Sequence, residues 1–339
     1  MTIGVAIIGL GFMGRTHLGA YRAAGDACRL VGVADRDPGR LRGEVSEGGN
    51  LDTGSSPVER LFDPEAVFAT DSIDALLSRR DVDAVSVCTP TETHAEIARA
   101  AIQAGKHVLI EKPVSLDRGE IESLATDADR AGVVAMPAMC MRFWPEWAWL
   151  AGRVGSGDAV ASLSLERLGT VPSWGGGFYD DPTRSGGAMY DLHIHDTDFV
   201  CHLLGRPDAV TATGSRSRMT TIYAYDNGPD HVVASGGWLR GGADFRMRYV
   251  AELESGTADF DLLREPTLKL SNVGAASEPA AVHLEDGSAY DAEVGAFLES
   301  IARGGPPPVC LADASLTLAV LEAEVASLTS GRRVRIPSQ

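Results

Sequence analysis

The sequence is poor in cysteine, and its few cysteines are badly placed for a shared site. Five occur among 339 residues: Cys28, Cys88, Cys140, Cys201 and Cys310. Their odd number and wide scatter argue against a disulfide framework and against a zinc site, and are typical of reduced thiols. We therefore assign these side chains no chemistry and expect no metal.

Positive charge and long apolar runs are also scarce. Lys and Arg number 30 against 47 Asp and Glu, which gives a formal net charge of −17. A nucleic-acid-binding protein needs a basic face to neutralise phosphates, so this balance argues against such a partner. No apolar run approaches the roughly 20 residues of a membrane span. The run Ile3–Leu10 is too short for a signal peptide and continues into a glycine motif. The sequence therefore predicts a cytoplasmic protein that binds no membrane.

What the chain does contain is a regular alternation of apolar runs and helical segments up to residue 136. The expected strands are Ile3–Ile8, Leu30–Ala34, Val67–Ala69, Ala84–Cys88, Val108–Ile110 and Val133–Met136. Helical stretches are expected at 15–24, 72–78, 93–104 and 117–131. Repeated β–α units of this spacing predict a parallel, doubly wound sheet, so residues 1–136 are expected to form a Rossmann domain that binds a dinucleotide.

After about residue 137 the pattern changes. Alternating strand-like segments separated by hairpin-sized turns predict a mainly antiparallel sheet. The segments are 159–167, 209–214, 232–240, 245–253 and 257–262, with helices near 186, at 292–303 and at 313–328. Residues 137–339 are therefore expected to form an α+β domain.

A glycine turn follows the first strand. The residues Gly9, Gly11, Phe12, Met13 and Gly14 form a G-x-G-x-x-G motif between a strand and a helix. The first glycine permits the tight turn, the second lets the backbone approach a pyrophosphate, and the third lets helix and strand pack closely. The pyrophosphate is expected at the amino terminus of the helix.

The second strand ends in an acid about 20 residues beyond the glycine turn. Asp35 occupies the place where a dinucleotide fold binds the adenosine ribose hydroxyls. A carboxylate there repels a 2′-phosphate, so NAD is favoured over NADP. Arg36, directly beside it, could hold that phosphate if Asp35 turned away, and NADP stays possible.

A charged pair and a proline end the strand Val108–Ile110. Pro113 fixes its own φ and restricts the residue before it, so Lys112 is expected in an extended or turn geometry. Such a tight turn is a place for a cis X–Pro bond. Ligands of α/β proteins bind at the carboxyl ends of parallel strands. Lys112 is therefore a candidate site residue, with a surface lysine as the alternative.

Asp191 and His195 form a second constellation. Four residues apart, they share one face of an expected helix. Three interpretations remain: a solvated acidic face, a metal site that also uses His193 and neighbouring acids, or metal-free acid–base catalysis. On a straight helix His193 lies away from the face of His195, and the H-E-x-x-H spacing is absent, which argues against metal. Catalysis is favoured, because histidine is the usual general acid and base and a carboxylate can orient it.

Four motifs together resemble the glucose–fructose oxidoreductase, inositol dehydrogenase and rhizopine catabolism (Gfo/Idh/MocA) family. They are the glycine turn, Cys88–His94, Glu111–Pro113, and Gly186–Asp191 with His195, in family order and at family-like spacing. The resemblance covers nearly the whole chain. It implies NAD(P)-dependent oxidation or reduction of one secondary alcohol of a sugar or cyclitol, and an open C-terminal sheet that mediates homodimers or homotetramers.

The resemblance also carries residues over to this chain. Lys112, Asp191 and His195 match the family's catalytic positions. The expected cofactor-binding residues are Gly9, Gly11, Phe12, Met13, Gly14, Asp35, Arg36, Thr89, Pro90, Thr91, His94, Glu111 and Lys112. Candidate substrate-pocket residues are Arg142, Trp174, Tyr179 and Arg184. The chain departs from the family's pattern in two places: it has an insertion-like segment, Gly48–Ser56, and an unusually aromatic segment, Met139–Trp149.

These residues suggest a mechanism. His195 is the candidate general base and Lys112 donates a hydrogen bond to the same oxygen, although the two could exchange roles. Asp191 would bind a neighbouring hydroxyl or orient one of them. Two other functions stay open on this scaffold: a glycosidase that uses tightly held NAD for transient oxidation, and a non-enzymatic sensor of NAD and a sugar.

Overall fold

A computed structural model describes residues 2–44, 60–173, 177–179, 181–274, 278–284 and 287–337. The insertion-like segment Gly48–Ser56 and Trp174 lie outside these ranges. The chain divides into two compact units. Unit 1 comprises Met1–Phe143, Ser173–Phe178 and Gly287–Ser315, and unit 2 comprises Trp144–Pro172, Tyr179–Asp286 and Leu316–Gln339. The boundary at residues 136 and 137 stays a prediction from sequence.

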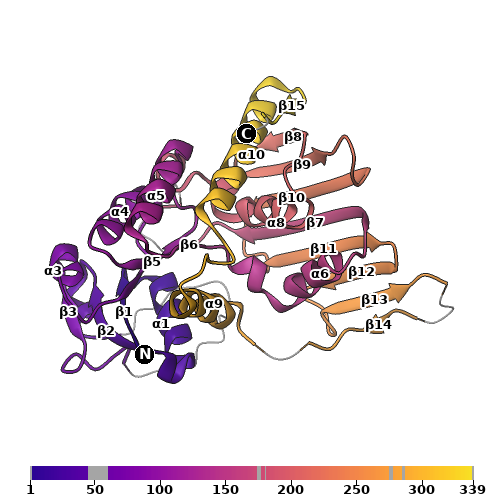
Figure 1. Ribbon diagram of the computed structural model, residues 1–339. Coiled ribbons are helices and arrows are strands. Elements are labelled where there is room, and N and C mark those ends of the chain that lie inside the picture. Colours follow the sequence, from indigo (N-terminus) through magenta and orange to yellow (C-terminus); the bar gives the residue numbers. More distant parts are fainter. Residues whose placement is uncertain are drawn as a thin grey trace. The chain divides into compact units, whose positions relative to one another are not determined.

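Unit 1 contains a six-stranded parallel sheet in the order β3-β2-β1-β4-β5-β6 (Figure 1). Its strands are β1 (Ile3–Ile8), β2 (Cys28–Ala34), β3 (Phe68–Thr70), β4 (Ala84–Val87), β5 (His107–Glu111) and β6 (Ala135–Ala138). This is the strand order of a dinucleotide-binding Rossmann fold. The predicted fold class is confirmed.

Helices connect these strands. They are α1 (Phe12–Ala23), α2 (Pro38–Leu41), α3 (Ile73–Leu77), α4 (His94–Gln103) and α5 (Arg118–Ala131). Local sequence sets the ends of α5: the Asp117 side chain accepts a hydrogen bond from the Gly119 amide, and Gly132 is left-handed with φ of 66°. These are the preferred amino- and carboxyl-terminal caps of a helix.

Burial explains why β1 is uniformly apolar. All six of its residues are buried, as expected for a central parallel strand covered on both faces. A later helix, α9 (Ala289–Arg303), also belongs to unit 1 and packs against α1. The Rossmann unit is thus completed by a segment from near the other end of the chain.

Unit 2 contains a nine-stranded sheet in the order β14-β13-β12-β11-β7-β10-β9-β8-β15. Its strands are β7 (Val160–Thr170), β8 (Ala209–Ser215), β9 (Arg218–Ala224), β10 (His231–Leu239), β11 (Arg246–Leu253), β12 (Gly256–Asp261), β13 (Leu268–Asn272), β14 (Ala280–Ala281) and β15 (Val334–Arg335). The sheet is antiparallel apart from the pairing of β7 with β10, which is parallel.

Unit 2 also contains helical segments. They are α6 (Pro145–Gly155), α7 (Pro182–Ser185), a π-helical turn Met189–His193, α8 (Ile194–Leu204) and most of α10 (Leu311–Ser330), whose first five residues belong to unit 1. Figure 1 shows α6 and α8 over one face of the sheet. Trp147 of α6 is fully buried there, with its ring 4.6 Å from that of Phe199 and 5.5 Å from that of Tyr249.

The two faces of this sheet differ in exposure. Along β11 and β9, exposed or half-buried residues alternate with buried ones, as in a sheet that packs its core on one side. Ile222 lies on the more exposed face and is 50% accessible. A homodimer or homotetramer formed through this sheet stays a prediction.

None of the helices within the described ranges has both the length and the apolar character needed to cross a membrane. In the same ranges, no three His, Cys, Asp or Glu side chains are grouped so that they could hold a metal ion.

Candidate active site

The turn between β1 and α1 is shaped by its glycines. Gly9 has φ of +90°, and a Cβ there would lie 2.6 Å from the Cys88 carbonyl oxygen. A Cβ on Gly14 would lie 1.8 Å from the Gly9 carbonyl oxygen, so neither position accepts a side chain. A Cβ on Gly11 would meet nothing within 4 Å. The chain therefore keeps open space at the amino terminus of α1, where amides and the helix dipole attract the pyrophosphate of a dinucleotide.

Asp35 is held against this turn. Its Oδ2 accepts a hydrogen bond from the Leu10 amide at 2.6 Å, and its Oδ1 accepts one from the Asp37 amide at 2.8 Å. Arg40 Nη1 lies 3.4 Å from the same Oδ2. These contacts hold the Asp35 carboxylate in place. Arg36 was expected to bind a 2′-phosphate only if Asp35 turned away, and Asp35 does not. Arg36 itself is exposed.

This arrangement predicts the effect of Asp35→Ala on cofactor preference. Loss of the carboxylate removes its repulsion of a 2′-phosphate and releases Arg40 to bind it. The ratio of kcat/KM for NADP to that for NAD should rise about a hundredfold, since like-charge juxtaposition costs several kcal/mol. Because both values are measured on the same variant, a loss of affinity common to the two cofactors does not affect the ratio. Asp37→Ala, which removes the neighbouring exposed acid, is the control, and an equal change in it would contradict the assignment.

The segment after β4 is tied to the turn after β5 by His94. Its Nδ1 lies 2.8 Å from the Pro113 carbonyl oxygen, and its Nε2 lies 2.7 Å from the Thr89 carbonyl oxygen. Burial lowers the pKa of His94 despite these two acceptors. A neutral imidazole donates to only one acceptor at a time. His94 therefore donates to one of these carbonyl oxygens and contacts the other, so its ring lies between two loops of unit 1.

A buried hydrogen-bond chain leads to Lys112. Tyr21 Oη lies 2.8 Å from Ser86 Oγ, Ser86 Oγ lies 3.1 Å from His17 Nδ1, and His17 Nε2 lies 3.0 Å from Glu111 Oε1. Glu111 Oε2 accepts from the Lys112 amide at 3.1 Å. Burial alone would raise the pKa of Glu111, but the hydrogen bond from His17 and nearby positive charge hold it below its ordinary value. Glu111 is thus a carboxylate, and His17 donates to it.

Lys112 follows this carboxylate directly. It is half-buried at the end of β5, and the Lys112–Pro113 bond is cis. The expected turn is therefore present. Glu111 accepts a hydrogen bond from the Lys112 amide, and His94 contacts the Pro113 carbonyl oxygen.

Glu293, a residue the sequence analysis missed, is buried in the same unit. It lies on α9 and is 0% exposed, and neither of its carboxyl oxygens has a hydrogen-bond partner among the residues that the structure describes. Burial raises its pKa well above the ordinary value, and Glu111 adds to the effect. The sequence did offer a sign of this burial, because Glu293 falls on the same apolar face of α9 as Tyr290 and Phe297.

The raised pKa predicts a pH-dependent stability. In the unfolded chain Glu293 ionises near pH 4.3, so its contribution to folding is complete below that pH and is lost as pH rises through the folded pKa. Each pH unit in that interval costs about 1.4 kcal/mol. Because Glu293→Gln cannot ionise, the Tm of this variant relative to that of the wild type should increase as pH rises above about 5. The control is Glu299→Gln on the same helix, where the side chain is 55% exposed. A constant difference in Tm across this range would contradict the assignment.

In unit 2, the segment with Asp191 and His195 is not a straight α-helix. Met189–His193 forms a π-helical turn, and α8 begins at Ile194. The expectation of one regular helix was wrong at this turn. Asp191 is half-buried on the π turn, and His195, on the first turn of α8, is 9% exposed. π-helical turns are rare and occur frequently at functional sites.

The acids of α8 do not form a solvated face. Asp196 is 0% exposed, and its Oδ1 accepts from Arg167 Nε at 3.0 Å and Nη2 at 2.9 Å. Asp198 is 1% exposed and accepts from Thr317 Oγ1 at 3.1 Å. The alternative of a solvated acidic face is therefore excluded.

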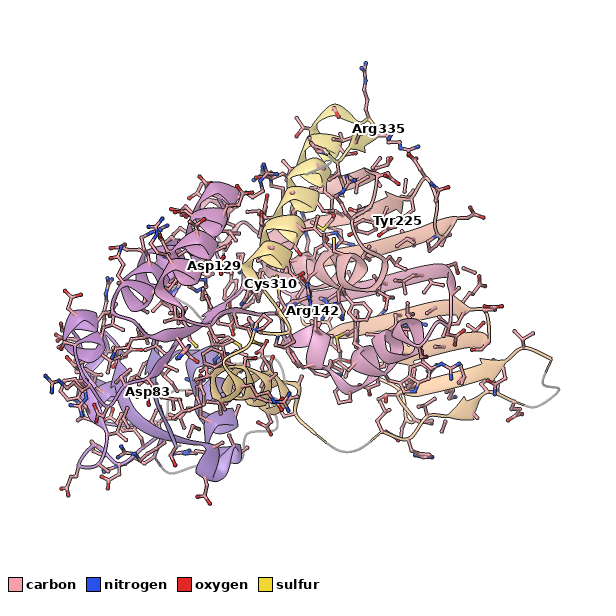
Figure 2. All side chains as sticks on the ribbon, viewed as in Figure 1. Asp83, Asp129, Arg142, Tyr225, Cys310 and Arg335 are labelled. Carbon is pink, nitrogen blue, oxygen red and sulfur yellow. The ribbon has the colours of Figure 1, made fainter. Side chains whose placement is uncertain are left out.

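The expected substrate residues lie in different places. Arg142, labelled in Figure 2, is buried in unit 1, with Nη1 3.4 Å from Asp313 Oδ2. In unit 2, the ring of Tyr179 lies 6.5 Å from that of Trp238, and Arg184 is half-buried in α7. Lys112 belongs to unit 1, whereas Asp191 and His195 belong to unit 2. Their joint use on one substrate stays a proposal.

Two family models match the chain. The model of the Gfo/Idh/MocA oxidoreductase family with an NAD-binding Rossmann fold matches residues 3–139. The model of the Gfo/Idh/MocA C-terminal domain matches residues 158–256.

Individual proteins are similar over most of their length. An inositol 2-dehydrogenase of Rhizobium meliloti is 26% identical over 99% of this chain and 100% of its own. A UDP-N-acetylglucosamine 3-dehydrogenase of Acidithiobacillus ferrooxidans is 31% identical over 88% of this chain and 89% of its own. The structure of a levoglucosan dehydrogenase in complex with NADH and levoglucosan has the same fold, with a TM-score of 0.82, 21% identity and 100% of both chains covered.

Proposed function

Because the chain belongs to the Gfo/Idh/MocA family of NAD-binding oxidoreductases, we propose that it oxidises or reduces one secondary hydroxyl of a sugar, sugar derivative or cyclitol. One observation carries the proposal: the open glycine turn is found in the same chain as the acid–base candidates Lys112, Asp191 and His195. Relatives named as inositol and UDP-sugar dehydrogenases support the substrate class.

The dinucleotide would be held by unit 1. Gly9 and Gly14 shape the turn, Gly11 leaves room for the pyrophosphate, and Asp35 would accept hydrogen bonds from the adenosine ribose. When bound, NAD supplies the acceptor or donor of the hydride at nicotinamide C4. The protein's own side chains would bind the substrate, stabilise its developing charge and transfer the hydroxyl proton.

His195 is the proposed proton acceptor during oxidation. A histidine side chain can take the hydroxyl proton as the carbonyl forms. Lys112 would donate a hydrogen bond to the same oxygen and stabilise the negative charge that develops there. Asp191 would bind an adjacent hydroxyl, which fixes which carbon of a polyol reacts.

A substrate screen tests the proposal. Binding of NAD and NADP is first compared by thermal shift, and reduced nicotinamide is then followed by absorbance over a panel of inositols, aldoses and UDP-sugars. Steady formation of NADH with at least one polyol is the expected result. Release of an aglycone from a glycoside without net NADH would indicate the glycosidase, and ligand binding without turnover would indicate the sensor.

A further inference from the structure

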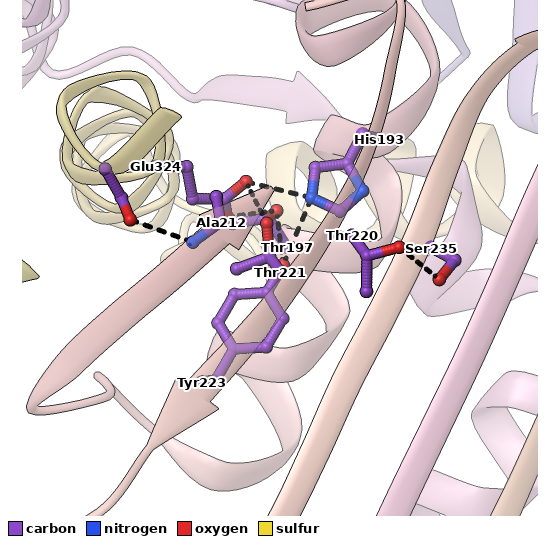
Figure 3. Close-up of polar contacts among 9 residues, drawn as sticks. His193, Thr197, Ala212, Thr220, Thr221, Tyr223, Ser235 and Glu324 are labelled. Carbon is purple, nitrogen blue, oxygen red and sulfur yellow. Dashed lines mark hydrogen bonds and ion pairs between the residues drawn. The ribbon is translucent and has the colours of Figure 1, made fainter. Parts of the chain in front are cut away.

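A buried polar cluster in unit 2 has no part in the proposed chemistry. It brings together side chains from the π turn, α8, β9 and α10, and Figure 3 shows them converging on one carboxylate. Its members, here called the Glu324 cluster, are His193, Thr197, Thr221, Tyr223 and Glu324. Four of them are 0% exposed and Tyr223 is 1% exposed.

Both oxygens of Glu324 are engaged. Its Oε2 lies 2.9 Å from His193 Nε2 and accepts from Thr221 Oγ1 at 2.9 Å. Its Oε1 accepts from Thr197 Oγ1 at 3.1 Å, and Thr197 Oγ1 lies 2.9 Å from Tyr223 Oη. A carboxylate buried this deeply needs a positive partner, and His193 is placed to provide it.

The charges around His193 favour its protonated form. Burial alone would lower the pKa of His193, but Glu324 raises it above the ordinary value, and Asp196 acts in the same direction against Arg167. Burial keeps Tyr223 neutral by raising its pKa. Two buried ion pairs, His193 with Glu324 and Arg167 with Asp196, thus lie beside each other.

His193 is also confined from the side of the sheet. A Cβ on Gly236 of β10 would lie 2.8 Å from His193 Nδ1 and 3.1 Å from its Cβ. The imidazole therefore packs directly on the backbone of β10, while its Nε2 is bonded to α10. Contact on one side and an ion pair on the other leave the ring little freedom to move.

His193 lies between the two acid–base candidates of unit 2 in the sequence. It is the last residue of the π turn, two residues after Asp191 and two before His195. Any rotation of the turn about its axis moves both side chains. A π turn is rarer than an α turn, so its geometry needs support from contacts outside the turn. The Glu324 cluster provides such a contact at His193.

We propose that His193 and Glu324 are positioning residues, whose buried ion pair holds the π turn in the register that presents Asp191 and His195 to the substrate. The catalytic consequence rests on the proposed function. The orientation of His195 does not, and it can be measured without a substrate.

A purely stabilising role is the rival explanation, and a double variant separates the two. Removal of Glu324 alone leaves the buried His193 imidazole without its hydrogen-bond partner, so Glu324→Met should lower Tm markedly. Replacing both, as His193→Leu with Glu324→Met, removes both charges together, and Tm should return to within a few degrees of wild type. Gln at position 324 keeps the hydrogen-bonding shape and is the conservative variant.

Catalysis should not recover with Tm. In the double variant kcat should stay about a hundredfold below wild type, the size of effect expected from displacing a catalytic group by about 1 Å. The Kd for NADH should be unchanged. Glu324→Gln keeps a hydrogen-bonding side chain but loses the charge, so its kcat should lie between those of the wild type and the double variant. If kcat of the double variant returns with Tm, the pair only stabilises the fold and the inference is wrong.

Two threonines on neighbouring positions provide a matched control. Thr221 donates to Glu324, whereas Thr220 lies on the opposite face of the sheet, 2.9 Å from Ser235 Oγ (Figure 3). Thr221→Val should lower kcat, and Thr220→Val should not. Equal effects of the two changes would contradict the inference.

Nuclear magnetic resonance of ¹⁵N-histidine-labelled protein provides the readout that needs no substrate. The His195 signal is assigned by its loss in His195→Gln, and its titration is compared between wild type and the double variant. A changed His195 pKa with an intact fold supports the inference, and an unchanged one overturns it. If the wild type turns over no polyol, the proposed function fails and this titration still decides the positioning role.

Discussion

Lys112→Ala should lower kcat for polyol oxidation by about a hundredfold to a thousandfold, the loss expected when a hydrogen-bond donor to a developing oxyanion is removed. Binding of NADH should fall much less than kcat, because the glycine turn and Asp35, which would hold the pyrophosphate and the adenosine ribose, are retained. The measurement is steady-state turnover with the best substrate from the screen, together with NADH titration. Lys269→Ala, on β13 of unit 2, is the matched control. Wild-type turnover by Lys112→Ala would rule out the assigned role.

The same variant helps decide which group accepts the proton. If His195 is the base, kcat/KM of Lys112→Ala keeps its fall at acid pH, whereas His195→Ala loses that limb. If Lys112 is the base, the outcome is reversed. Lys112→Arg should not restore activity, since the planar guanidinium cannot reproduce the compact ammonium and does not give up its proton.

Gly11→Val should abolish NAD binding without unfolding the protein. The side chain would enter the space at the start of α1 that the pyrophosphate needs, and a Cβ there meets nothing in the protein within 4 Å. We expect a loss of at least a hundredfold in NADH affinity by fluorescence titration, with Tm in the absence of cofactor close to wild type.

Valine substitutions at two other glycines serve as controls for Gly11→Val. Gly152→Val, on the exposed side of α6, adds the same side chain where a Cβ also meets nothing within 4 Å, and it should leave NADH binding intact. Gly14→Val should instead lower Tm, because its Cβ would lie 1.8 Å from the Gly9 carbonyl oxygen. If Gly11→Val binds NADH normally, the pyrophosphate does not lie on this turn.

Features encoded by neighbouring residues were predictable from sequence. The glycine turn, the strand before it and the acid Asp35 follow one another within a single β–α–β unit, so their spacing alone identifies the dinucleotide fold. The turn at Lys112–Pro113 was likewise predictable, since proline restricts the residue before it.

Features that depend on distant partners were not predictable. The π turn at Met189–His193 is bonded to Glu324, 131 positions from His193, and the local sequence reads as an ordinary helix. Strand β9 was missed because the hairpin from β8 turns through Arg216 and Ser217, without the glycine or asparagine that marks a two-residue loop. The burial of Glu293 depends on α9 packing against α1, a pairing that neither helix shows by itself.

The packing of α9 against α1 also sets an order of events during synthesis. Helix α1 emerges from the ribosome early, whereas α9 is made after every strand of the nine-stranded sheet except β15. N-terminal domains generally fold first as a chain is made. Here the Rossmann unit is completed late, because its own last helix follows most of the other unit. A nascent chain of this protein therefore carries an uncovered α1 while unit 2 is being translated, and a shortened chain that ends before Ala289 would keep it uncovered.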